Sequence, residues 1–423
     1  MLDIKTIRER ETDVRTALQT RGSDFDLDCI LELDMERRSL VGEAEALKHE
    51  RNVVSKEIGR LKKEGEDAAE QRDQMRAVGE RISKMDARIR EIDSTLQGLL
   101  LEVPNIPCAE TPVGSDESAN RLVKTRGEPG SFSFTPRSHV ELGEMLGILD
   151  FERAARISGS GFPLLKGHGA RLERILIQFM LDIHTMEHGY EEVAPPYMCN
   201  ADAMTGTGQL PKLAEDMYYI KSDDLYLIPT AEVPVTNMYR EEIIKGSLPI
   251  RHVAYTPCFR REAGAAGRET RGMIRVHQFD KVELVKIVEP DQSYAELETL
   301  LGDAETVLQR LELPYRVREL CTGDLSFAAA RCYDIELWAP GQNDWLEVSS
   351  CSNFEDFQAR RAGIRYRNSS GKTVFPHTLN GSGVALARLV VAILENYQEA
   401  DGSVVIPEAL RSLMRMDKIQ PRS

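Results

Sequence analysis

Residues 257–283 are dense in side chains that could bind phosphate and carboxylate groups. The stretch has the pattern of a strand ending near Arg260, a glycine-rich charged loop, and a returning strand that carries Arg275. Two guanidinium groups on rigid strands suit anions, because each planar fork can donate two hydrogen bonds. Glu262 and Glu283 lie among these cations and could accept hydrogen bonds from an amine or a hydroxyl. An ordinary hairpin with surface ion pairs is the alternative interpretation.

The sequence lacks the common phosphate and zinc motifs. No GxGxxG fingerprint follows a strand, and no GxxxxGK[ST] loop occurs. Cys258 and Cys351 have no CxxC partner and no Cys/His cluster beside them, so we expect buried thiols and no zinc. The seven cysteines form no close pairs, which is typical of reduced cytosolic thiols.

A sheet must position these residues, and the pattern from about residue 108 onward predicts one. We expect strands at 217–220, 225–228, 253–256, 281–287, 334–337 and 345–349, and helices at 169–188, 294–311 and 384–399. Several strands follow one another with no helix between them. This order favours an α+β fold, with an antiparallel or mixed sheet flanked by helices.

The first hundred residues have a different pattern, an apolar repeat of seven. One series runs through Leu33, Leu40, Leu47, Val54 and Leu61, and after a polar break at 64–67 a second series runs Met75, Ile82, Ile89 and Leu96, interleaved with Val78, Met85, Ile92 and Leu99. Two such stripes joined by a short turn predict an antiparallel coiled-coil hairpin. Each helix would have about 33 residues and a length of roughly 50 Å, so we expect the hairpin to project as an arm.

The hairpin carries local basic stripes although the chain as a whole is acidic. Residues 47–63 hold six basic side chains against Glu50 and Glu57, and with Arg76 on the second helix the candidates for contacting a phosphate backbone are Lys48, Arg51, Lys56, Arg60, Lys62, Lys63 and Arg76. A solvated coiled-coil face or a dimerisation rod has a similar charge pattern, so the charges alone leave this open.

The composition fits a water-soluble chain of two or three domains. The 423 residues include 69 acidic and 54 basic side chains, a formal net charge of −15. There is no apolar run of about 18 residues and no signal peptide, so we expect no membrane association. Because the acidic total hides the local basic stripes, it does not exclude an RNA partner.

Six motifs in register resemble one family. Phe259-Arg260-x-Glu262, followed by a loop and by Arg275-x-His277-Gln278-Phe279, resembles motif 2 of class II aminoacyl-tRNA synthetases. The continuation through Lys281 and Glu283 is similar to the seryl-tRNA synthetase family, of bacterial type. Residues 189–196 resemble motif 1, residues 206–211 and 228–232 resemble the serine-site loops, and residues 347–353 and 378–383 lead into motif 3, which ends on Arg388. The resemblance covers essentially the whole chain.

The resemblance implies a two-step reaction and a domain division. L-Serine attacks the α-phosphate of ATP to give seryl-adenylate, and the seryl group then passes to the 3′-terminal adenosine of tRNA(Ser), with tRNA(Sec) as a possible second acceptor. It implies an N-terminal tRNA-binding domain at 1–105, with its arm at about 31–101, and a class II catalytic domain at 106–423. It further implies a cytoplasmic homodimer that uses ATP and Mg²⁺.

The family's roles carry over residue by residue. Arg260 bridges the α-phosphate and the serine carboxylate, Arg275 assists on the phosphates, and Arg388 holds the γ-phosphate. Oxygens for Mg²⁺ come from Glu347 and Ser350. Phe279, which in isolation would be a core aromatic, stacks on adenine. The remaining ATP-site residues are Arg261, Glu262, Val276, Val348 and Ser349; the serine-site residues are Thr230, Ala231, Glu232, Arg260, Glu283, Asn380 and Ser382.

One residue departs from the pattern, and two other functions stay open. Ala387 precedes Arg388 where we expect glycine or proline in many relatives, and we expect Arg388 to keep its position. A related synthetase fold could activate another small amino acid or charge an acceptor other than tRNA. A catalytically inactive relative that only binds RNA or protein is the second alternative, which the intact Arg260, Glu283 and Arg388 disfavour.

Overall fold

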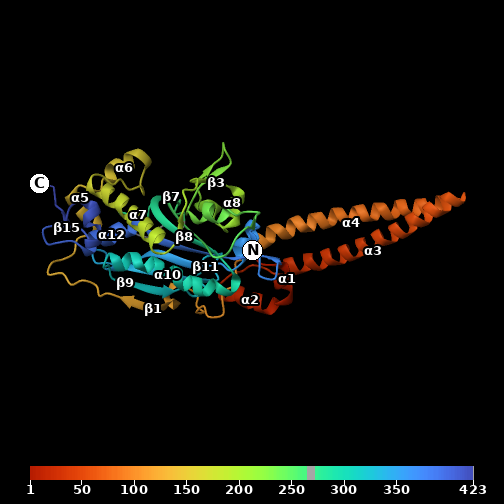
Figure 1. Ribbon diagram of the computed structural model, residues 1–423, viewed down its shortest axis with the longest axis horizontal. Helices are drawn as coiled ribbons and strands as arrows, with labels where there is room; N and C mark the ends of the chain where they lie inside the picture. The colour runs from red at the N-terminus through yellow and green to blue at the C-terminus, as the bar shows by residue number, and fades with distance from the viewer. Residues whose placement is uncertain (264–271, 423) are drawn as a thin grey trace. The chain divides into compact units, whose positions relative to one another are not determined.

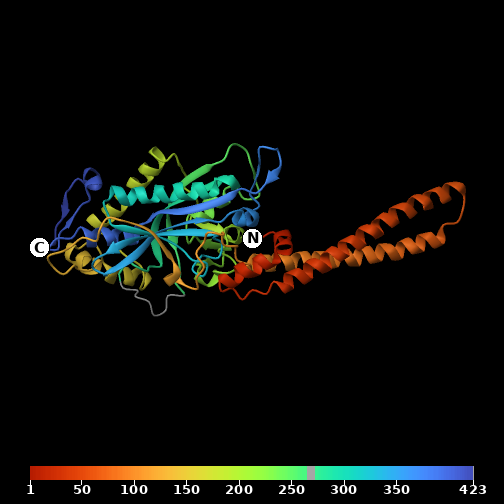
Figure 2. The same cartoon turned by 90° about the horizontal axis from the view of Figure 1, so that it is seen from below.

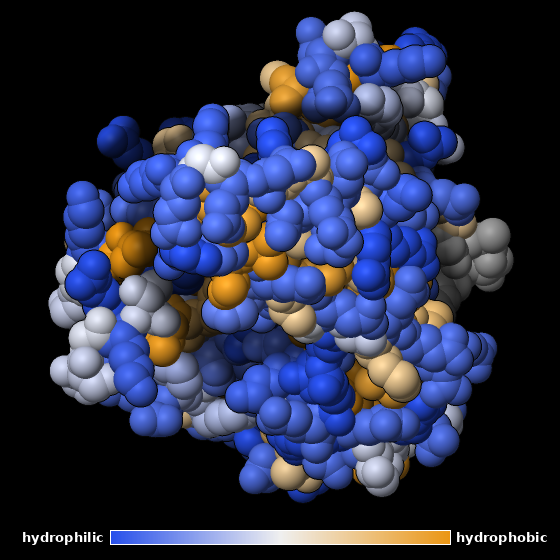
Figure 3. Space-filling view, turned by 90° about the vertical axis from the view of Figure 1, so that its right-hand side faces the viewer, coloured by the Kyte–Doolittle hydropathy of each residue, from blue (hydrophilic) through white to orange (hydrophobic). Residues whose placement is uncertain are grey.

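The computed structural model describes residues 1–263 and 272–422, so the loop predicted at 264–271 lies outside the described residues. The chain divides into two compact units: residues 1–19 with 23–104, and residues 20–22 with 105 onward. Within the described ranges, no helix is both long enough and apolar enough to cross a lipid bilayer. The face seen in Figure 3 is mostly hydrophilic with small scattered hydrophobic patches.

The first unit contains the predicted helical hairpin. Two short helices, α1 (Ile4–Glu9) and α2 (Glu11–Thr20), precede α3 (Asp28–Glu64) and α4 (Ala69–Glu102), which lie side by side (Figures 1 and 2). The heptad residues are buried or half-buried, with Leu61, Ile82, Ile92 and Leu96 at most 9% exposed. The turn begins at Gly65, whose φ of +79° ends α3 in the left-handed conformation that glycine adopts without strain. The heptad prediction is confirmed.

Ion pairs across the two long helices add to the apolar seam. Arg37 pairs with Asp93 at 2.5 Å, Lys48 with Asp86 at 2.8 Å, and Arg88 with Glu36 at 2.7 Å. These side chains are partly exposed, so each pair contributes at most about 1 kcal/mol. Their main effect is on register, because a sliding helix would separate all three pairs together.

The second unit is built on one eight-stranded sheet in the order β1-β9-β10-β11-β14-β8-β7-β2. All neighbours are antiparallel except β2 and β7, which are parallel, so the predicted mixed sheet is confirmed. The strands are β1 (Arg121–Arg126), β9 (Tyr315–Glu319), β10 (Arg331–Ala339), β11 (Asp344–Asn353), β14 (His377–Ala385), β8 (Gln278–Val288), β7 (Ile250–Phe259) and β2 (Glu191–Glu192).

Three helices cover one face of this sheet and form the main core. These are α7 (His168–Met186), α10 (Ser293–Arg310) and α12 (Leu386–Asn396), and their apolar side chains share one buried cluster with Val282, Leu284 and Val288 of β8 (Figures 1 and 2). Successive side chains of a strand point to opposite faces. The odd-numbered residues of β8, including Phe279, Lys281 and Glu283, therefore belong to the other face.

The helix predicted at 384–399 starts later than expected. Val384 and Ala385 still belong to β14, because its ladder with β8 continues through Ala385 opposite Lys281, and α12 begins at Leu386. On β14 the residue between the two polar positions 380 and 382 must be glycine: a Cβ on Gly381 would lie 3.0 Å from Cys351 Sγ and 3.1 Å from Leu300 Cγ.

Smaller elements surround the sheet. The helices are α5 (His139–Leu146), α6 (Phe151–Ser158), α8 (Ala201–Gly206), α9 (Glu232–Asn237), α11 (Phe357–Ala362) and α13 (Glu408–Met414), and the 3₁₀ turns are η1 (Glu117–Ala119), η2 (Ala214–Asp216) and η3 (Pro290–Gln292). The strands outside the main sheet are β3 (Met198–Asn200), β4 (Tyr219–Ile220), β5 (Leu225–Leu227), β6 (Ile243–Ile244), β12 (Arg365–Arg367), β13 (Thr373–Val374), β15 (Val404–Val405) and β16 (Lys418–Ile419).

Candidate active site

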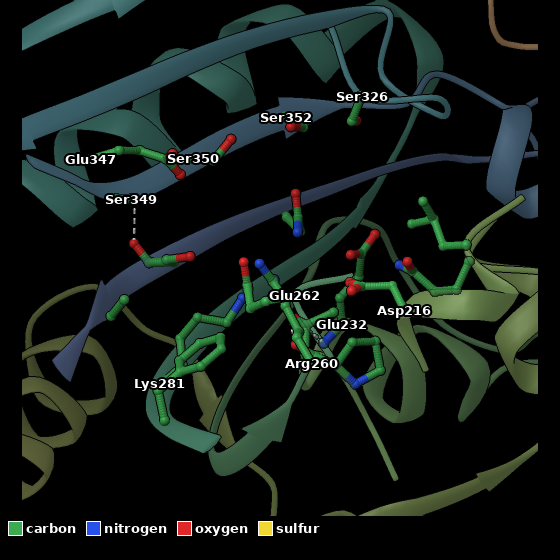
Figure 4. A pocket seen from close by; sticks show the side chains of 18 of the residues that line it. Asp216, Glu232, Arg260, Glu262, Lys281, Ser326, Glu347, Ser349, Ser350 and Ser352 are labelled. Atoms are coloured by element: carbon green, nitrogen blue, oxygen red, sulfur yellow. Dashed lines mark hydrogen bonds between the residues drawn. The ribbon is translucent and has the colours of Figure 1, made fainter. Parts of the chain in front are cut away.

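A cavity of about 510 Å³ opens on the face of the sheet opposite to α10 and α12. Figure 4 shows Glu347, Ser350 and Ser352 of β11 on one side and Arg260, Glu232 and Glu262 on the other. Of the predicted site residues, fourteen line this cavity: Thr230, Glu232, Arg260, Glu262, Arg275, Val276, Phe279, Glu347, Val348, Ser349, Ser350, Asn380, Ser382 and Arg388.

The predicted site residues outside this lining are Ala231, Arg261 and Glu283. Ala231 is fully buried in an apolar cluster with Val235, Ala254 and Val285. Arg261 points its guanidinium at the ring of Tyr218, with 5.9 Å between Cζ and the ring centroid. Glu283 is fully buried beneath the cavity and acts on it through the polar residues that it contacts.

The Glu283 carboxylate organises the floor of the cavity. It forms an ion pair with Lys281, accepts a hydrogen bond from Thr230 Oγ1 at 3.2 Å and accepts another from Asn380 Nδ2 at 3.0 Å. Asn380 Oδ1 is buried and has no partner among the described atoms. A buried charge is stable only when it is paired and hydrogen-bonded, and these three residues provide both.

A second carboxylate, Glu232, lies beside the first at the start of α9. It is 6% exposed, and its Oε1 accepts a hydrogen bond from Gln358 Nε2 at 2.5 Å. Burial raises the pKa of Glu232 to about 7, and the nearby Glu283 charge adds to this shift. The cavity floor therefore favours a ligand that brings a positive charge to Glu232.

Arg260 directly follows β7, and two hydrogen bonds, one from its backbone and one from its side chain, fix its orientation. Its Nε donates to the Pro229 carbonyl at 3.3 Å, and its guanidinium lies 5.2 Å from the centre of the Phe279 ring. The backbone N–H of Arg260 donates to the His277 carbonyl at 3.0 Å, which extends the pairing of the two strands. His277 Nδ1 is 3.1 Å from the Arg260 carbonyl, so this histidine has a structural role.

The other two predicted cations are each held by one carboxylate. Arg275 Nη1 is 3.3 Å from Glu262 Oε2. Arg388, in the first turn of α12, donates from Nη1 to the Glu347 carbonyl at 2.6 Å and lies 3.6 Å from Glu347 Oε2. Incoming phosphate oxygens could replace these carboxylates as partners of the two guanidinium groups.

A β-bulge explains why Glu347 and Ser350 both face the cavity. Residues three apart on a regular strand point to opposite faces. The ladder between β10 and β11 shifts at Val348, since Ile335 pairs with Ser349 and Glu336 pairs with Glu347. The extra residue restores Glu347 and Ser350 to the same side, where both line the cavity.

Residues with no assigned role in the sequence prediction hold the motif 2 segment. The Asp216 carbonyl accepts from Arg261 N at 2.9 Å, and its Oδ1 accepts from Ala263 N at 3.1 Å. At the other end His139 Nε2 accepts from Met273 N at 3.1 Å, while His139 Nδ1 lies 3.0 Å from Glu395 Oε1. Since Nε2 is an acceptor, Nδ1 carries the proton and donates to Glu395.

The cavity includes further residues that the sequence prediction did not assign. Lys281 could have been found, because it is two residues from Glu283 on one strand and therefore on the same face. The cavity wall formed by Ser326, Phe327 and Ala328 has no local signal, since its position depends on contacts with distant parts of the chain.

The seven basic arm residues divide by their partners. Lys48 pairs with Asp86, Arg60 with both Glu57 and Glu64, and Arg76 with Asp73. Among the described residues, the other four have no ion-pair partner and are exposed or half-exposed: Arg51, Lys56, Lys62 and Lys63. These four are the arm residues best able to neutralise phosphates.

Comparisons with known proteins agree over the whole chain. Residues 1–107 match the family model described as the seryl-tRNA synthetase N-terminal domain, and residues 218–397 match the class II tRNA synthetase core domain (G, H, P, S and T). The chain is 58% identical to a serine–tRNA ligase of Carboxydothermus hydrogenoformans over 421 residues, 99% of each chain. It is 59% identical to that of Pelotomaculum thermopropionicum over 415 residues, 98% of each. The crystal structure of a Pyrococcus horikoshii seryl-tRNA synthetase complexed with ATP superposes with a TM-score of 0.96 at 40% identity, covering 100% of both chains.

The raised pKa of Glu232 predicts a pH-dependent cost in stability. Its folded-state pKa of about 7 lies above the usual glutamate value of 4.5, so the stability that the protonated residue contributes is lost as the pH rises from about 4.5 through 7. We expect Glu232→Gln to increase the free energy of unfolding by about 3 kcal/mol at pH 8 and by little at pH 5.

Melting temperatures of the protein without ligands at both pH values check this expectation. Glu215→Gln is the matched control, because Glu215 is an exposed carboxylate on η2. A Glu232→Gln protein that melts at the wild-type temperature at pH 8 would show that Glu232 is ionised without penalty.

Proposed function

The chain belongs to the seryl-tRNA synthetase family of class II aminoacyl-tRNA synthetases, and from this premise we infer that it acts as a serine–tRNA ligase. It activates L-serine with ATP to give seryl-adenylate and pyrophosphate. It then transfers the seryl group to the 3′-terminal adenosine of tRNA(Ser).

One observation carries the assignment of the first step: Arg260 lies at the same cavity as the two buried carboxylates Glu232 and Glu283. Serine has a carboxylate that must approach the α-phosphate of ATP, and both groups are anions. A fixed guanidinium between them lowers this repulsion and orients the attack, which needs no protein nucleophile. Glu232, on the same side of the cavity as Arg260, would hold the serine ammonium group.

The serine hydroxyl would be recognised by Glu283 together with Asn380, Thr230 and Ser382. Asn380 Oδ1 is buried without a partner, which supports a ligand that donates a hydrogen bond. Alanine lacks that donor, so its binding would leave buried polar groups unpaired, and such sites discriminate strongly. Rejection of threonine would depend on the shape of the cavity.

The ATP site would occupy the side of the cavity nearer Phe279 and Arg388. We propose that Phe279 stacks on adenine, with Glu262 and the Val276 backbone at the edge of the base. Arg275 and Arg388 would exchange their carboxylate partners for phosphate oxygens. The backbone of Val348 and Ser349, fixed by the 2.6 Å hydrogen bond from Ser349 Oγ to the Ser382 carbonyl, would border the nucleotide.

Glu347 and Ser350 fit a Mg²⁺ ion in the chemistry of their donors, a carboxylate and a hydroxyl oxygen. Burial raises the pKa of Asp334 well above its usual range, and the charge of Glu347 adds to the shift. A cation here would relieve this repulsion between carboxylates. When bound, Mg²⁺ would neutralise developing charge on the phosphates. Within the described residues, no group of three His, Cys, Asp or Glu side chains could hold a metal by itself.

Serine-dependent exchange between pyrophosphate and ATP tests the first step without tRNA. We expect exchange with serine at least about 100-fold above that with alanine, as expected for a site that pairs with the substrate hydroxyl. Arg260→Ala should abolish exchange, whereas Arg10→Ala, at an exposed arginine in the first unit, should leave it unchanged. Equal exchange with serine, alanine, glycine and threonine would favour another small amino acid, and no exchange would favour the inactive relative.

In the same assay, the Glu347→Gln variant should require a higher Mg²⁺ concentration than the wild type to reach half of its maximal rate.

The second step would depend on the unpaired basic residues of α3. We expect the triple change of Lys56, Lys62 and Lys63 to Gln to weaken tRNA(Ser) binding and to reduce the slope of log affinity against log salt by about 2 to 3. Serine-dependent exchange should stay at the wild-type rate. The control removes the same charge from exposed lysines of the second unit, at Lys221, Lys245 and Lys372. An unchanged salt slope in the arm variant would leave the arm without a role in tRNA binding.

Acceptance of tRNA(Sec) stays a prediction, which charging of a tRNA(Sec) transcript checks. We also propose a cytoplasmic location, because the proposed reaction needs tRNA as its acceptor.

We propose that the chain acts as a homodimer through the segment around motif 1. Three apolar side chains flank it and are exposed: Met186 at 79%, Tyr197 at 43% and Met198 at 47%. Sedimentation at micromolar concentration should give twice the chain mass, and Met186→Glu with Met198→Glu should give the monomer. Met35→Glu, at an exposed methionine of α3, is the control. A monomeric wild-type protein would contradict the proposal.

A further inference from the structure

One wall of the cavity is an irregular segment, residues 325–329, between β9 and β10. Ser326, Phe327 and Ala328 line the cavity (Figure 4 labels Ser326). The segment contains one backbone hydrogen bond of its own, from Ala329 N to the Ser326 carbonyl at 3.2 Å. It therefore depends on other parts of the chain for its conformation.

Every carbonyl of this wall accepts a hydrogen bond from one of two distant residues. Arg21 donates from Nη2 to the carbonyls of 325 at 3.2 Å and 326 at 2.5 Å, and from Nη1 to that of 329 at 3.0 Å. Asn105 donates from its backbone N–H to the carbonyl of 327 at 3.0 Å and from Nδ2 to that of 328 at 2.9 Å. The two residues thus hold five consecutive carbonyls.

The surroundings of the Arg21 side chain indicate that its hydrogen bonds serve to position the carbonyls of the wall. Its guanidinium is half-buried, and burial lowers the pKa of Arg21 to about 10. Its described hydrogen bonds go to carbonyls alone, and among the described residues no carboxylate pairs with it. Burying the Arg21 charge without a carboxylate partner costs free energy, so these bonds contribute little net stability. The planar Arg21 guanidinium, however, fixes the spacing of the three carbonyls that it contacts.

The wall is connected by contacts to the predicted serine side of the cavity. A Cβ on Gly208 would lie 3.4 Å from Ala328 Cβ and 3.7 Å from Phe327 Cδ1, so the wall packs closely on the loop of residues 207–209. Gln358 Nε2 donates both to the Thr207 carbonyl at 3.1 Å and to Glu232 Oε1 at 2.5 Å. The described hydrogen bonds and ring contacts of the wall include those to Arg21, Asn105, Phe357 and Arg361, and none of them involves Arg275, Phe279 or Arg388 of the predicted ATP side.

We propose that Arg21 and Asn105 are positioning residues of the amino-acid pocket, which rests on the proposed activation of serine. They hold the 325–329 wall against the 207–209 loop and through it keep Glu232 in place. In the sequence, Arg21 lies just before α3 and Asn105 just after α4. The wall is thus attached to the chain at both ends of the α3–α4 hairpin.

Two substitutions change the donors of this clamp. Arg21→Lys keeps the charge but replaces the planar fork, whose Nη1 and Nη2 reach different carbonyls, with a single nitrogen. Asn105→Asp keeps the shape and the Oδ1 acceptor for Ile106 N, and it replaces the donor to the carbonyls of 328 and 354 with an oxygen that repels them when ionised. Arg10→Lys is the control, because Arg10 contacts Asp13 on the exposed surface of the first unit.

Pyrophosphate exchange without tRNA, in the full-length protein, separates positioning from folding. For both variants we expect the KM for serine to rise about tenfold, the scale of losing one hydrogen bond inside a protein. The KM for ATP should stay within twofold and Arg10→Lys should match the wild type. Active-site titration and the melting temperature identify the folded fraction. If Arg21→Lys folds poorly, Asn105→Asp still decides the outcome.

A wild-type KM for serine in folded Asn105→Asp, or equal rises in both KM values, would overturn the positioning role. A loss confined to the number of active sites would also overturn it. These outcomes differ from a failure of the proposed function, which would appear as absent serine-dependent exchange in the wild-type protein.

Discussion

The burial of two neighbouring carboxylates is the constraint on which the rest of the site depends. Glu283 is fully buried and Glu232 nearly so, and their mutual repulsion adds to the loss of hydration. Lys281, Thr230 and Asn380 compensate Glu283 directly, and Gln358 holds Glu232. Burying these two carboxylates costs free energy in the protein without ligand. A small ligand with an ammonium group and a hydroxyl would offset that cost by pairing with them. Under the proposed function, selectivity for serine and the cost of the site in stability have the same physical origin.

The sheet separates the polar floor from the apolar core, because successive side chains of each strand point to opposite faces. One face of β8 and β14 is apolar and packs on α10 and α12, and the other carries the polar floor. Where alternation would misplace a side chain, the ladder is shifted: a bulge at Val348 brings Glu347 and Ser350 to the same face. Arg260 directly follows β7 and Arg388 lies in α12. Arg275 was predicted on the returning strand, but β8 begins only at Gln278, so Arg275 lies in the irregular segment before it and is held there by Glu262.

The sequence predicted the features that depend on local periodicity or on contiguous motifs. Heptads predicted α3 and α4, and the succession of strands predicted a mixed antiparallel sheet. The motif residues fall around one cavity, although their individual roles stay predictions. The start of α12 was wrong because strand pairing through Ala385 overrides helical propensity. Asp216, His139 and the 325–329 wall could not be predicted, because their roles come from hydrogen bonds between residues far apart in the chain, and no local pattern encodes such a pairing.

The clamp on the 325–329 wall also has a consequence for synthesis of the chain. Arg21 and Leu325 are 304 residues apart. Ribosomes add roughly 5–20 residues per second, so Arg21 is made about 15–60 s before its acceptors exist. The helices of the first unit can form during that interval, whereas the cavity wall cannot. The nascent protein therefore acquires its hairpin early, gains the cavity wall much later, and completes its amino-acid pocket only after Ser382, the last of the predicted serine-site residues, has been translated.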